Sequence, residues 1–292
     1  MHKAGFVNII GYPNVGKSTL MNALVGEKLS IITSKAQTTR HRIMGIVNSD
    51  DFQIVYSDTP GIVKDPSYKM HEFMNSYIET ALVDADIILL VIEAGQTFEH
   101  QEVIDRISKS KIPVIVVLNK IDLSNQDTVV EQIEHWKTSI TNAEVIPVSA
   151  LEKFNVESVF ERILHNLPES PAYFSKDEFT DRSMRFFISE IIREKILLNY
   201  KKEIPYSVEV AVEEYKDEER IVRISANIYT SRETQKAIIL GHQGKSIKKV
   251  GTQARLDMEE FIGKKVFLEL TVKTTKDWRN NEKLLERFGY GN

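Results

Sequence analysis

The chain has 292 residues, of which 42% are hydrophobic and 27% charged, and its formal net charge is −4. This balance supplies enough apolar residues for two ordinary domains and excludes a disordered or fibrous chain. Cysteine is absent, which excludes a disulfide framework and a thiol nucleophile and favours a reducing compartment. The first residues lack the features of a signal peptide and no apolar run is long enough for a membrane span, so we expect a cytoplasmic protein.

The first half alternates short apolar runs with amphipathic helical stretches, a pattern typical of a parallel sheet with crossover helices. The runs expected as strands are Phe6–Ile10, Ile43–Val47, Phe52–Tyr56, Asp86–Ile92, Pro113–Leu118 and Val145–Val148. The second and third runs are close enough in sequence to form an antiparallel hairpin at the sheet edge. We therefore expect an α/β domain over residues 1–168, with a mostly parallel sheet and one antiparallel edge strand, followed by a polar linker over 169–184.

A phosphate-binding motif follows the first expected strand. Gly11-Tyr12-Pro13-Asn14-Val15-Gly16-Lys17-Ser18 matches the P-loop pattern and opens a helix that continues with Thr19. Its backbone N–H groups and the helix N-terminus should surround phosphate oxygens. Lys17 should reach the β- and γ-phosphates, and the Ser18 hydroxyl should bind Mg²⁺. The alternative, a purely structural glycine turn, is disfavoured by the strand before the motif and the helix after it.

A second motif, Asp58-Thr59-Pro60-Gly61, follows the third expected strand. We expect Asp58 to hold Mg²⁺ through water and the Gly61 N–H to sense the γ-phosphate. Ile62 comes next and is counted with the nucleotide site. Ras-like enzymes have a glutamine there that orients the attacking water. Ile62 has no hydrogen-bonding group, so the site alone should hydrolyse a nucleoside triphosphate slowly.

A third motif, Asn119-Lys120-Ile121-Asp122, indicates which base is bound. A carboxylate only accepts hydrogen bonds, and Asp122 can accept two from the N1–H and amino group of guanine. Adenine offers no such pair of donors at that edge. Ser149-Ala150-Leu151 follows the last strand, and we expect the Ala150 N–H to contact guanine O6.

These three motifs in this order resemble the translation-factor-like GTPases over residues 5–167. The resemblance implies hydrolysis of GTP to GDP and phosphate, with a first switch at residues 37–41. We favour Thr39 over Thr38 as its ligand for Mg²⁺ and the γ-phosphate. The catalytic residues would be Asn14, Lys17, Thr39, Asp58 and Gly61. In a wider group of such enzymes a P-loop asparagine helps to hold potassium, so Asn14 could take K⁺ as a further cofactor; the alternative is that it only caps the loop.

The second half has a different pattern of elements. A helix around Arg185–Tyr200 precedes two alternating strands, a helix over Glu233–Leu240 and a second helix. That second helix carries an apolar face made of Ile247, Val250, Ala254, Met258 and Phe261. A third alternating strand contains Val266, Leu268, Leu270 and Val272. The predicted order over residues 185–292 is therefore α-β-β-α-α-β.

The loop Gly241-His242-Gln243-Gly244 lies between the last two helices, within a basic window. From Arg232 to Arg255 six basic residues accompany one acid, a pattern that suits polyanion binding or merely a solvated helix face. Together with the element order, the loop resembles that of a type II KH domain, which clamps about four nucleotides of single-stranded RNA. Lys245, Lys248 and Lys249 would contact phosphates, and His242 would either stack on a base or simply be exposed.

A P-loop GTPase joined to a KH domain resembles the Era family of bacterial GTPases over essentially the whole chain. The segments that carry this resemblance are GYPNVGKST, QTTRHR, DTPG, NKID, GHQGKSIK, the strand opening at Ile204-Pro205-Tyr206-Ser207-Val208, and the ending from Trp278 to Tyr290. The resemblance implies binding to the 3′ region of small-subunit (16S) ribosomal RNA and a role in assembly of the small (30S) subunit. It also implies contact with the inner face of the membrane, and we expect a monomer.

Two other functions fit part of the pattern. The second domain could dock a protein or a membrane, although the GxxG loop and the basic window argue against it. Alternatively, the chain could be an RNA-binding protein in which the nucleotide is only structural. Binding of single-stranded RNA would exclude the first alternative, and single-turnover cleavage of GTP would exclude the second.

Overall fold

The computed structural model describes residues 1–291, and Asn292, the last residue of the expected second domain, lies outside the described residues. The chain forms two compact units. The first comprises Met1–Ser30, Thr39–Pro66 and His71–Asp181. The second comprises Ile31–Thr38, Ser67–Met70 and the residues from Arg182 onward. Two short stretches from the first half of the sequence are therefore grouped with the second unit.

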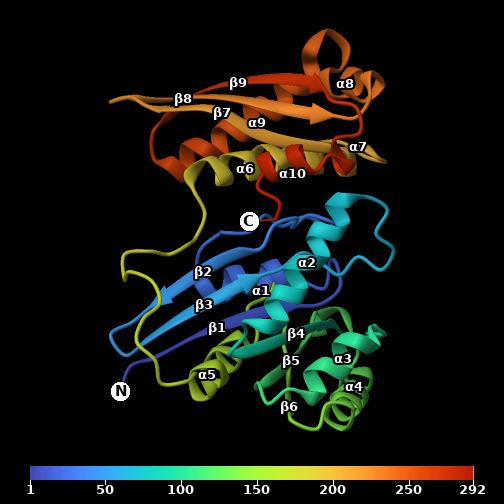
Figure 1. Ribbon diagram of the computed structural model, residues 1–292, viewed down its shortest axis with the longest axis vertical. Helices are drawn as coiled ribbons and strands as arrows, with labels where there is room; N and C mark the ends of the chain where they lie inside the picture. The colour runs from blue at the N-terminus through green and yellow to red at the C-terminus, as the bar shows by residue number, and fades with distance from the viewer. Residues whose placement is uncertain (292) are drawn as a thin grey trace. The chain divides into compact units, whose positions relative to one another are not determined.

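The first unit is built on a six-stranded sheet in the order β2-β3-β1-β4-β5-β6 (Figure 1). Only β2 runs antiparallel to its neighbour, which confirms the predicted hairpin at the edge. The strands are β1 Lys3–Ile10, β2 Ile43–Asn48, β3 Phe52–Asp58, β4 Ile87–Glu93, β5 Val114–Asn119 and β6 Ala143–Pro147. The helices are α1 Lys17–Val25, α2 Lys69–Val83, α3 Gln101–Lys109, α4 Gln126–Ser139 and α5 Val156–Asn166, with a 3-10 turn over Ile121–Leu123.

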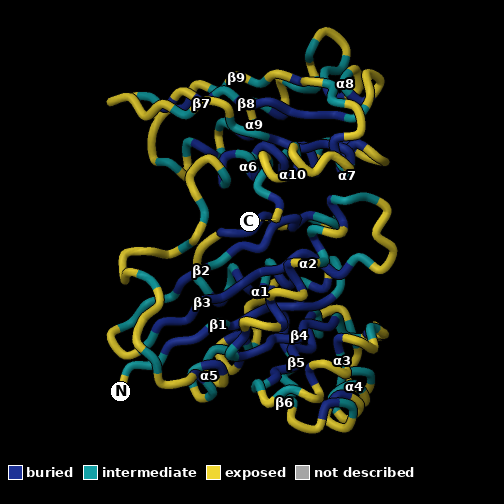
Figure 2. The backbone as a smooth tube through the Cα atoms, in the orientation of Figure 1, coloured by how far each residue is buried: buried dark blue, intermediate teal, exposed yellow. Residues whose placement is uncertain are grey.

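Helices cover the sheet of this unit because its central strands are apolar on both faces. Residues Ile87–Ile92 of β4 are all buried, as expected for a strand in the middle of a parallel sheet (Figure 2). Helices α2, α3 and α4 share one core with this part of the sheet, while α1 and α5 pack on each other. The carboxyl ends of the parallel strands are left for the loops that carry the nucleotide motifs.

The expected polar linker packs along the edge of this sheet. The Ile46 N–H donates to the Phe179 carbonyl (3.0 Å), and Gly45 forms a bridge with Thr180. The fully buried Gln53 side chain accepts from the Tyr173 and Phe174 N–H groups, at 2.7 and 2.9 Å. The segment thus satisfies edge groups of β2 that would otherwise be open to another strand.

The second unit contains a three-stranded sheet in the order β7-β8-β9. Strands β7 and β8 are antiparallel, whereas β8 and β9 are parallel. The elements are α6 Met184–Asn199, α7 Ile204–Ser207, β7 Val208–Asp217, β8 Ile221–Thr230, α8 Glu233–Leu240, α9 Lys245–Ile262, β9 Lys265–Thr274 and α10 Glu282–Arg287, with 3-10 turns over His242–Gly244 and Trp278–Asn280. The predicted α-β-β-α-α-β order of a type II KH domain is confirmed.

Two expectations about the second unit are wrong in detail. The segment expected to open the first strand is instead the one-turn helix α7, because Pro205 fits the first turn of a helix, and β7 begins at Val208. Phe261 was expected on the buried face of α9, but its side chain is 43% exposed. The Phe261 ring packs beside that of Phe187, with 5.6 Å between the ring centroids.

The end of the chain is anchored in the second unit by two buried aromatic residues. Trp278 is fully buried and its Nε1–H donates to the Ser207 carbonyl at 3.2 Å. Tyr290 is also fully buried and its hydroxyl donates to Glu209 Oε2 at 2.7 Å. None of the helices within residues 1–291 combines the length and the apolar character that a membrane-spanning segment needs.

Candidate nucleotide and RNA sites

The P-loop connects β1 to α1, and a glycine at its end is required by close contact. Gly16 has φ 97°, and a Cβ built on it would lie 2.2 Å from Asn119 Nδ2. The loop therefore lies against the third motif, with no room for a side chain. Of the other residues predicted here, Gly11 and Val15 are buried, Asn14 is exposed, and Tyr12, Pro13 and Thr19 are half-buried.

Lys17 projects back over the P-loop. Its Nζ donates to the carbonyls of Gly11 (3.1 Å) and Tyr12 (2.9 Å), and the side chain is buried. Burial lowers the pKa of Lys17 to about 8, although the charge of Asp58 opposes the shift. A phosphate beside this buried ammonium group would stabilise its charged form and so compensate for the hydration that burial removes.

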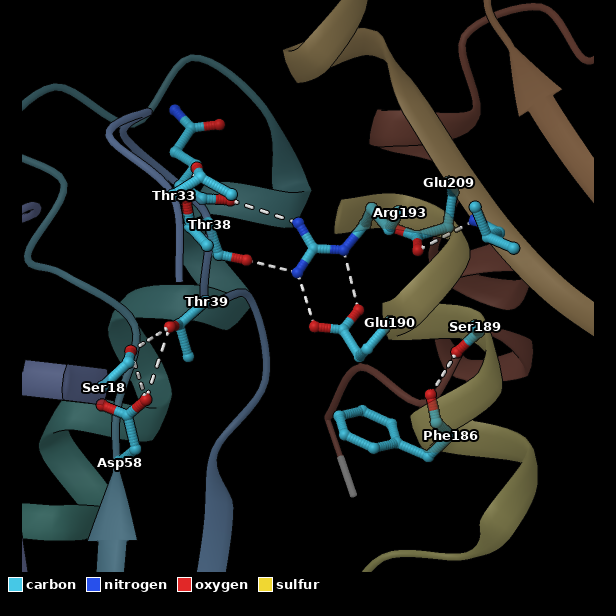
Figure 3. Close-up of polar contacts among 12 residues, drawn as sticks. Ser18, Thr33, Thr38, Thr39, Asp58, Phe186, Ser189, Glu190, Arg193 and Glu209 are labelled. Atoms are coloured by element: carbon cyan, nitrogen blue, oxygen red, sulfur yellow. Dashed lines mark hydrogen bonds and ion pairs between the residues drawn. The ribbon is translucent and has the colours of Figure 1, made fainter. Parts of the chain in front are cut away.

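Three hydroxyl and carboxylate side chains meet beside Lys17. Ser18 Oγ donates to Asp58 Oδ2 at 2.6 Å and lies 2.8 Å from Thr39 Oγ1, which is 3.4 Å from the same carboxylate oxygen (Figure 3). Thr38 Oγ1 instead pairs with Thr33 Oγ1 at 2.7 Å. The structure therefore places Thr39, and not Thr38, with Ser18 and Asp58.

This oxygen cluster suits a hard divalent cation. Asp58 Oδ1 is buried and has no hydrogen-bond partner among residues 1–291. Burial raises the pKa of Asp58, while Lys17 and the neighbouring hydroxyls oppose that shift. Oxygen donors of this kind, with one carboxylate oxygen left over for a bound water, are those that Mg²⁺ prefers.

The loop after β3 packs tightly on the P-loop. A Cβ built on Gly61 would lie 2.5 Å from Pro13 N, so Gly61 touches P-loop backbone. Thr59 Oγ1 donates to the Ile9 carbonyl at 2.7 Å, which ties the loop to β1. The side chain of Ile62 is buried in the apolar core of the first unit, whereas its backbone N–H donates to the Gly11 carbonyl of the P-loop at 3.4 Å, so Ile62 meets the nucleotide loop through its backbone alone.

Asn119 has a role that its motif alone did not indicate. Its Nδ2 donates to the Val15 carbonyl at 2.8 Å, and its Oδ1 accepts from the Ala150 N–H at 3.0 Å. One side chain thus joins the P-loop to the loop expected to contact guanine O6. The Ala150 N–H expected at O6 is already engaged here, so a base would have to share it.

The residues expected around the base lie on adjacent loops. Lys120 adopts a left-handed conformation with φ 61°, and its Nζ pairs with Glu93 at 2.5 Å. Asp122 follows in an exposed 3-10 turn. Ser149 is buried, whereas Leu151 is 74% exposed. Asp122 is therefore open to solvent and free to accept from a base.

In the second unit the GxxG loop forms a tight turn between α8 and α9. Gly241 and Gly244 have φ 69° and 74°, and the Gly244 N–H donates to the Gly241 carbonyl at 3.2 Å. The two residues between them, His242 and Gln243, are exposed. No charged side chain stands between the loop glycines, so a nucleic-acid backbone could approach the turn closely.

Beside this loop runs a groove of about 300 Å³ between α9 and β9. It is lined by Ile247, Lys248, Gly251, Thr252, Arg255, Leu268 and Leu270. Ile247, Leu268 and Leu270, which the sequence pattern puts on the apolar faces of α9 and β9, are half-buried against the core of the second unit and form the apolar floor of the groove. Lys245, Lys248 and Lys249 are exposed and form no ion pair within the described part of the chain.

The sequence of each unit matches a known domain family. Residues 6–120 match the family described as 50S ribosome-binding GTPase, and residues 203–279 match the KH domain family. The chain is 45% identical to GTPase Era of Syntrophus aciditrophicus (strain SB) over 99% of its own length and 96% of that protein. The chain belongs to the Era family of GTPases. It is therefore a GTP hydrolase with a P-loop GTPase domain and a KH domain.

Other Era-family proteins are similar over the same length. The chain is 44% identical to chloroplastic GTPase ERA1 of Zea mays, over 99% of the chain and 71% of that protein. A crystal structure of Era with MgGDPNP and nucleotides 1506–1542 of 16S ribosomal RNA matches all of both chains, with 37% identity and a TM-score of 0.95. A structure of an Aquifex aeolicus Era variant bound to GDP and AlF₄⁻ matches 99% of the chain and all of that protein, with 36% identity and a TM-score of 0.93.

Proposed function

We propose that this Era-family GTPase binds the 3′ region of 16S ribosomal RNA and acts in assembly of the 30S subunit, with GTP hydrolysis as a timer. The observation that carries this proposal is the groove between α9 and β9, which lies beside the GxxG loop and is flanked by three lysines without ion pairs in residues 1–291. The similar Era structure solved with nucleotides 1506–1542 of 16S ribosomal RNA supports the choice of RNA.

The groove combines the two features that single-stranded RNA needs. Its half-buried Ile247, Leu268 and Leu270 offer an apolar surface for unstacked bases, while Lys245, Lys248 and Lys249 can neutralise phosphates. The lysine contacts fix position and register without reading sequence. Where the RNA backbone passes the loop, it would contact Gly241, His242, Gln243 and Gly244.

A pair of substitutions at Gly244 tests the RNA site. A Cβ on Gly244 meets nothing within 4 Å, whereas one on Gly241 would lie 2.2 Å from Ser246 Oγ and would disturb the fold itself. Asparagine and aspartate both tolerate the left-handed conformation and have the same shape. Gly244→Asp should therefore weaken binding of a labelled 3′-end RNA oligonucleotide roughly tenfold or more relative to Gly244→Asn, because it sets a carboxylate beside phosphate.

The same measurement separates the alternatives. Equal RNA affinity of the two variants, measured by fluorescence anisotropy, would show that RNA does not pass this loop. A separate electrophoretic mobility-shift assay with the wild-type protein tests RNA binding itself. If the protein does not shift single-stranded RNA, the second unit docks a protein or a membrane instead. GDP affinity serves as the control and should be the same in both variants.

For the nucleotide we propose that the P-loop holds the phosphates, with Lys17 on the β- and γ-phosphates and the Gly61 N–H on the γ-phosphate. Ser18, Thr39 and Asp58 would hold Mg²⁺, Asp58 through water, and the ion when bound offsets negative charge on the phosphates. Asp122 would select guanine. The distances among Ser18, Thr39 and Asp58 support this assignment, as does Asp58 Oδ1, which has no hydrogen-bond partner within residues 1–291.

Potassium is proposed as an additional cofactor at Asn14, because Ile62 cannot orient water. A potassium ion held beside the phosphates would occupy the position that an arginine finger takes in other GTPases. Asn14 has φ 65°, so Asn14→Gly removes the side chain without the backbone strain that alanine would add. Hydrolysis should be faster in K⁺ than in Na⁺ at equal ionic strength, and Asn14→Gly should abolish that difference. A rate ratio near one for the wild type would rule out this role.

Three further predictions rest on the family resemblance: that the protein is cytoplasmic, that it is a monomer, and that it contacts the inner face of the membrane. Light scattering of the full chain measures its mass in solution. Co-sedimentation with vesicles of anionic lipid, with and without GDPNP, measures membrane binding directly.

A further inference from the structure

Helix α6 carries a buried ion pair whose arginine has hydrogen-bonding capacity left over. Arg193 Nε and Nη2 donate to Glu190 Oε1 and Oε2 at 2.7 and 2.6 Å (Figure 3). The two side chains are only 1% and 6% exposed. Burial alone would lower the pKa of Arg193, but pairing with Glu190 raises it, so the guanidinium stays charged. A bidentate carboxylate also fixes the plane of the guanidinium.

The remaining donors of Arg193 point to residues 31–38, which belong to the same compact unit. Arg193 Nη2 also donates to the Thr38 carbonyl, and Nη1 lies 3.5 Å from the Gln37 carbonyl. One helical turn later the Leu197 carbonyl accepts from Lys35 Nζ. Helix α6 therefore holds this segment at two points.

The segment is also braced from within. Thr38 Oγ1 donates to the Lys35 carbonyl at 2.6 Å and lies 2.7 Å from Thr33 Oγ1. Both the hydroxyl and the carbonyl of Thr38 are thus fixed. Because a peptide unit is planar, fixing the Thr38 carbonyl also fixes the N–H of Thr39 and the direction in which that residue leaves the segment.

We propose that Arg193, aimed by Glu190, is a positioning residue for the GTP site, which holds the Thr38–Thr39 peptide so that the Thr39 hydroxyl faces Ser18 and Asp58. This inference rests on the role proposed above for Thr39. Lysine could not replace Arg193, because a single ammonium group cannot hold the carboxylate at two points and a carbonyl at the same time.

The consequence is specific to the nucleoside triphosphate. Thr39 is proposed to contact Mg²⁺ and the γ-phosphate, and GDP has no γ-phosphate. Misplacing Thr39 should therefore weaken binding of GDPNP and leave binding of GDP nearly unchanged. A residue that only stabilises the fold would weaken both or neither.

A double-mutant cycle tests this proposal in the full-length chain. Dissociation constants for GDP and GDPNP, with Mg²⁺ present, are measured for the wild type, Arg193→Met, Thr39→Ala and the combination. We expect Arg193→Met to reduce the preference for GDPNP roughly tenfold, the scale of one charge-assisted hydrogen bond. In the Thr39→Ala background it should reduce that preference no further. Arg185→Gln, on an exposed arginine of the same helix, is the matched control and should change neither constant.

The possible results separate the two claims. If Thr39→Ala lowers the preference for GDPNP but Arg193→Met does not, or if the two effects add, the role of Arg193 is wrong and that of Thr39 stands. If Thr39→Ala leaves the preference unchanged, the proposed role of Thr39 fails, and this inference fails with it.

Removing Arg193 leaves Glu190 buried without its partner, so Arg193→Met could fail to fold. Glu190→Gln then carries the test, since it keeps the shape of the pair but holds the guanidinium less firmly. It should shift the preference in the same direction by a smaller factor. An unchanged preference in a folded Glu190→Gln and a folded Arg193→Lys would overturn the proposal.

Discussion

Replacing Gly61 with alanine should separate the two nucleotide states of this GTPase. A Cβ on Gly61 would lie 2.5 Å from Pro13 N and 2.6 Å from Pro13 Cα. Non-bonded carbon atoms prefer a separation of about 3.5–4.0 Å, so roughly 1 Å of movement is needed. The neighbouring P-loop residue Val15 is held by Asn119, so we expect the loop around Gly61 to move outward instead.

The size of the effect follows from that displacement. A hydrogen bond of about 2.9 Å from the Gly61 N–H to the γ-phosphate would lengthen beyond about 3.5 Å and be lost. A hydrogen bond to a charged group contributes about 1.5–3 kcal/mol, which corresponds to about 10- to 150-fold weaker binding of GDPNP. GDP has no γ-phosphate, and its affinity should stay within about twofold on the same reasoning.

Calorimetric titration of both nucleotides in Mg²⁺ measures this difference directly. Gly251→Ala is the control, because Gly251 lies inside helix α9 of the second unit and a Cβ there would meet only Leu270 Cδ1, at 3.4 Å, so this change should leave both affinities unchanged. If Gly61→Ala weakened GDP and GDPNP by the same factor, or weakened neither, contact with Pro13 would not be what positions the Gly61 N–H.

Three further predictions concern the base, the phosphate lysine and the second unit. Asp122→Asn should lose affinity for GTP and gain affinity for xanthosine triphosphate, because the amide can donate to the oxygen that replaces the guanine amino group; titration with both nucleotides checks this. Phosphates favour the charged form of Lys17, whose pKa without them is lowered to about 8, so GDP affinity should be constant below that pH and fall as the pH rises above it. Lys17→Met should bind weakly and without this pH dependence, and a flat wild-type profile up to pH 9 would contradict the assignment. Trp278→Ala should lower the free energy of unfolding of the second unit by about 3–5 kcal/mol in urea titrations, because it removes a fully buried indole, whereas GDP affinity should not change.

The sequence by itself determined the fold class and identified the residues that make up each nucleotide-binding motif. Strand-forming runs such as Ile87–Ile92 can be recognised locally, and the ends of parallel strands must meet at one edge of a sheet. The nucleotide motifs therefore predicted that Ser18 and Asp58 act together, whereas the pairing of β1 with β3 that brings them close came from the structure. The GxxG loop could be interpreted for the same reason, because its meaning comes from the elements on either side of it.

Only the tertiary structure decided what covers each side chain. Periodicity shows which face of α9 and β9 is apolar, but not that Ile247 and Leu268 line an open groove while Val250 lies in the core. Ile62 could be excluded as a water-orienting residue from its chemistry, yet its place in the core required the packing of α2 on the sheet.

Contacts between residues far apart in the sequence could not be predicted from the sequence either. Asn119 joins two loops, Gln53 holds the segment after α5, and Arg193 holds the Thr38 carbonyl 155 residues away. No local pattern marks such a side chain, because its partners are mostly backbone groups, which every residue possesses. Their positions are set by the path of the whole chain, and that is the information that the tertiary structure adds.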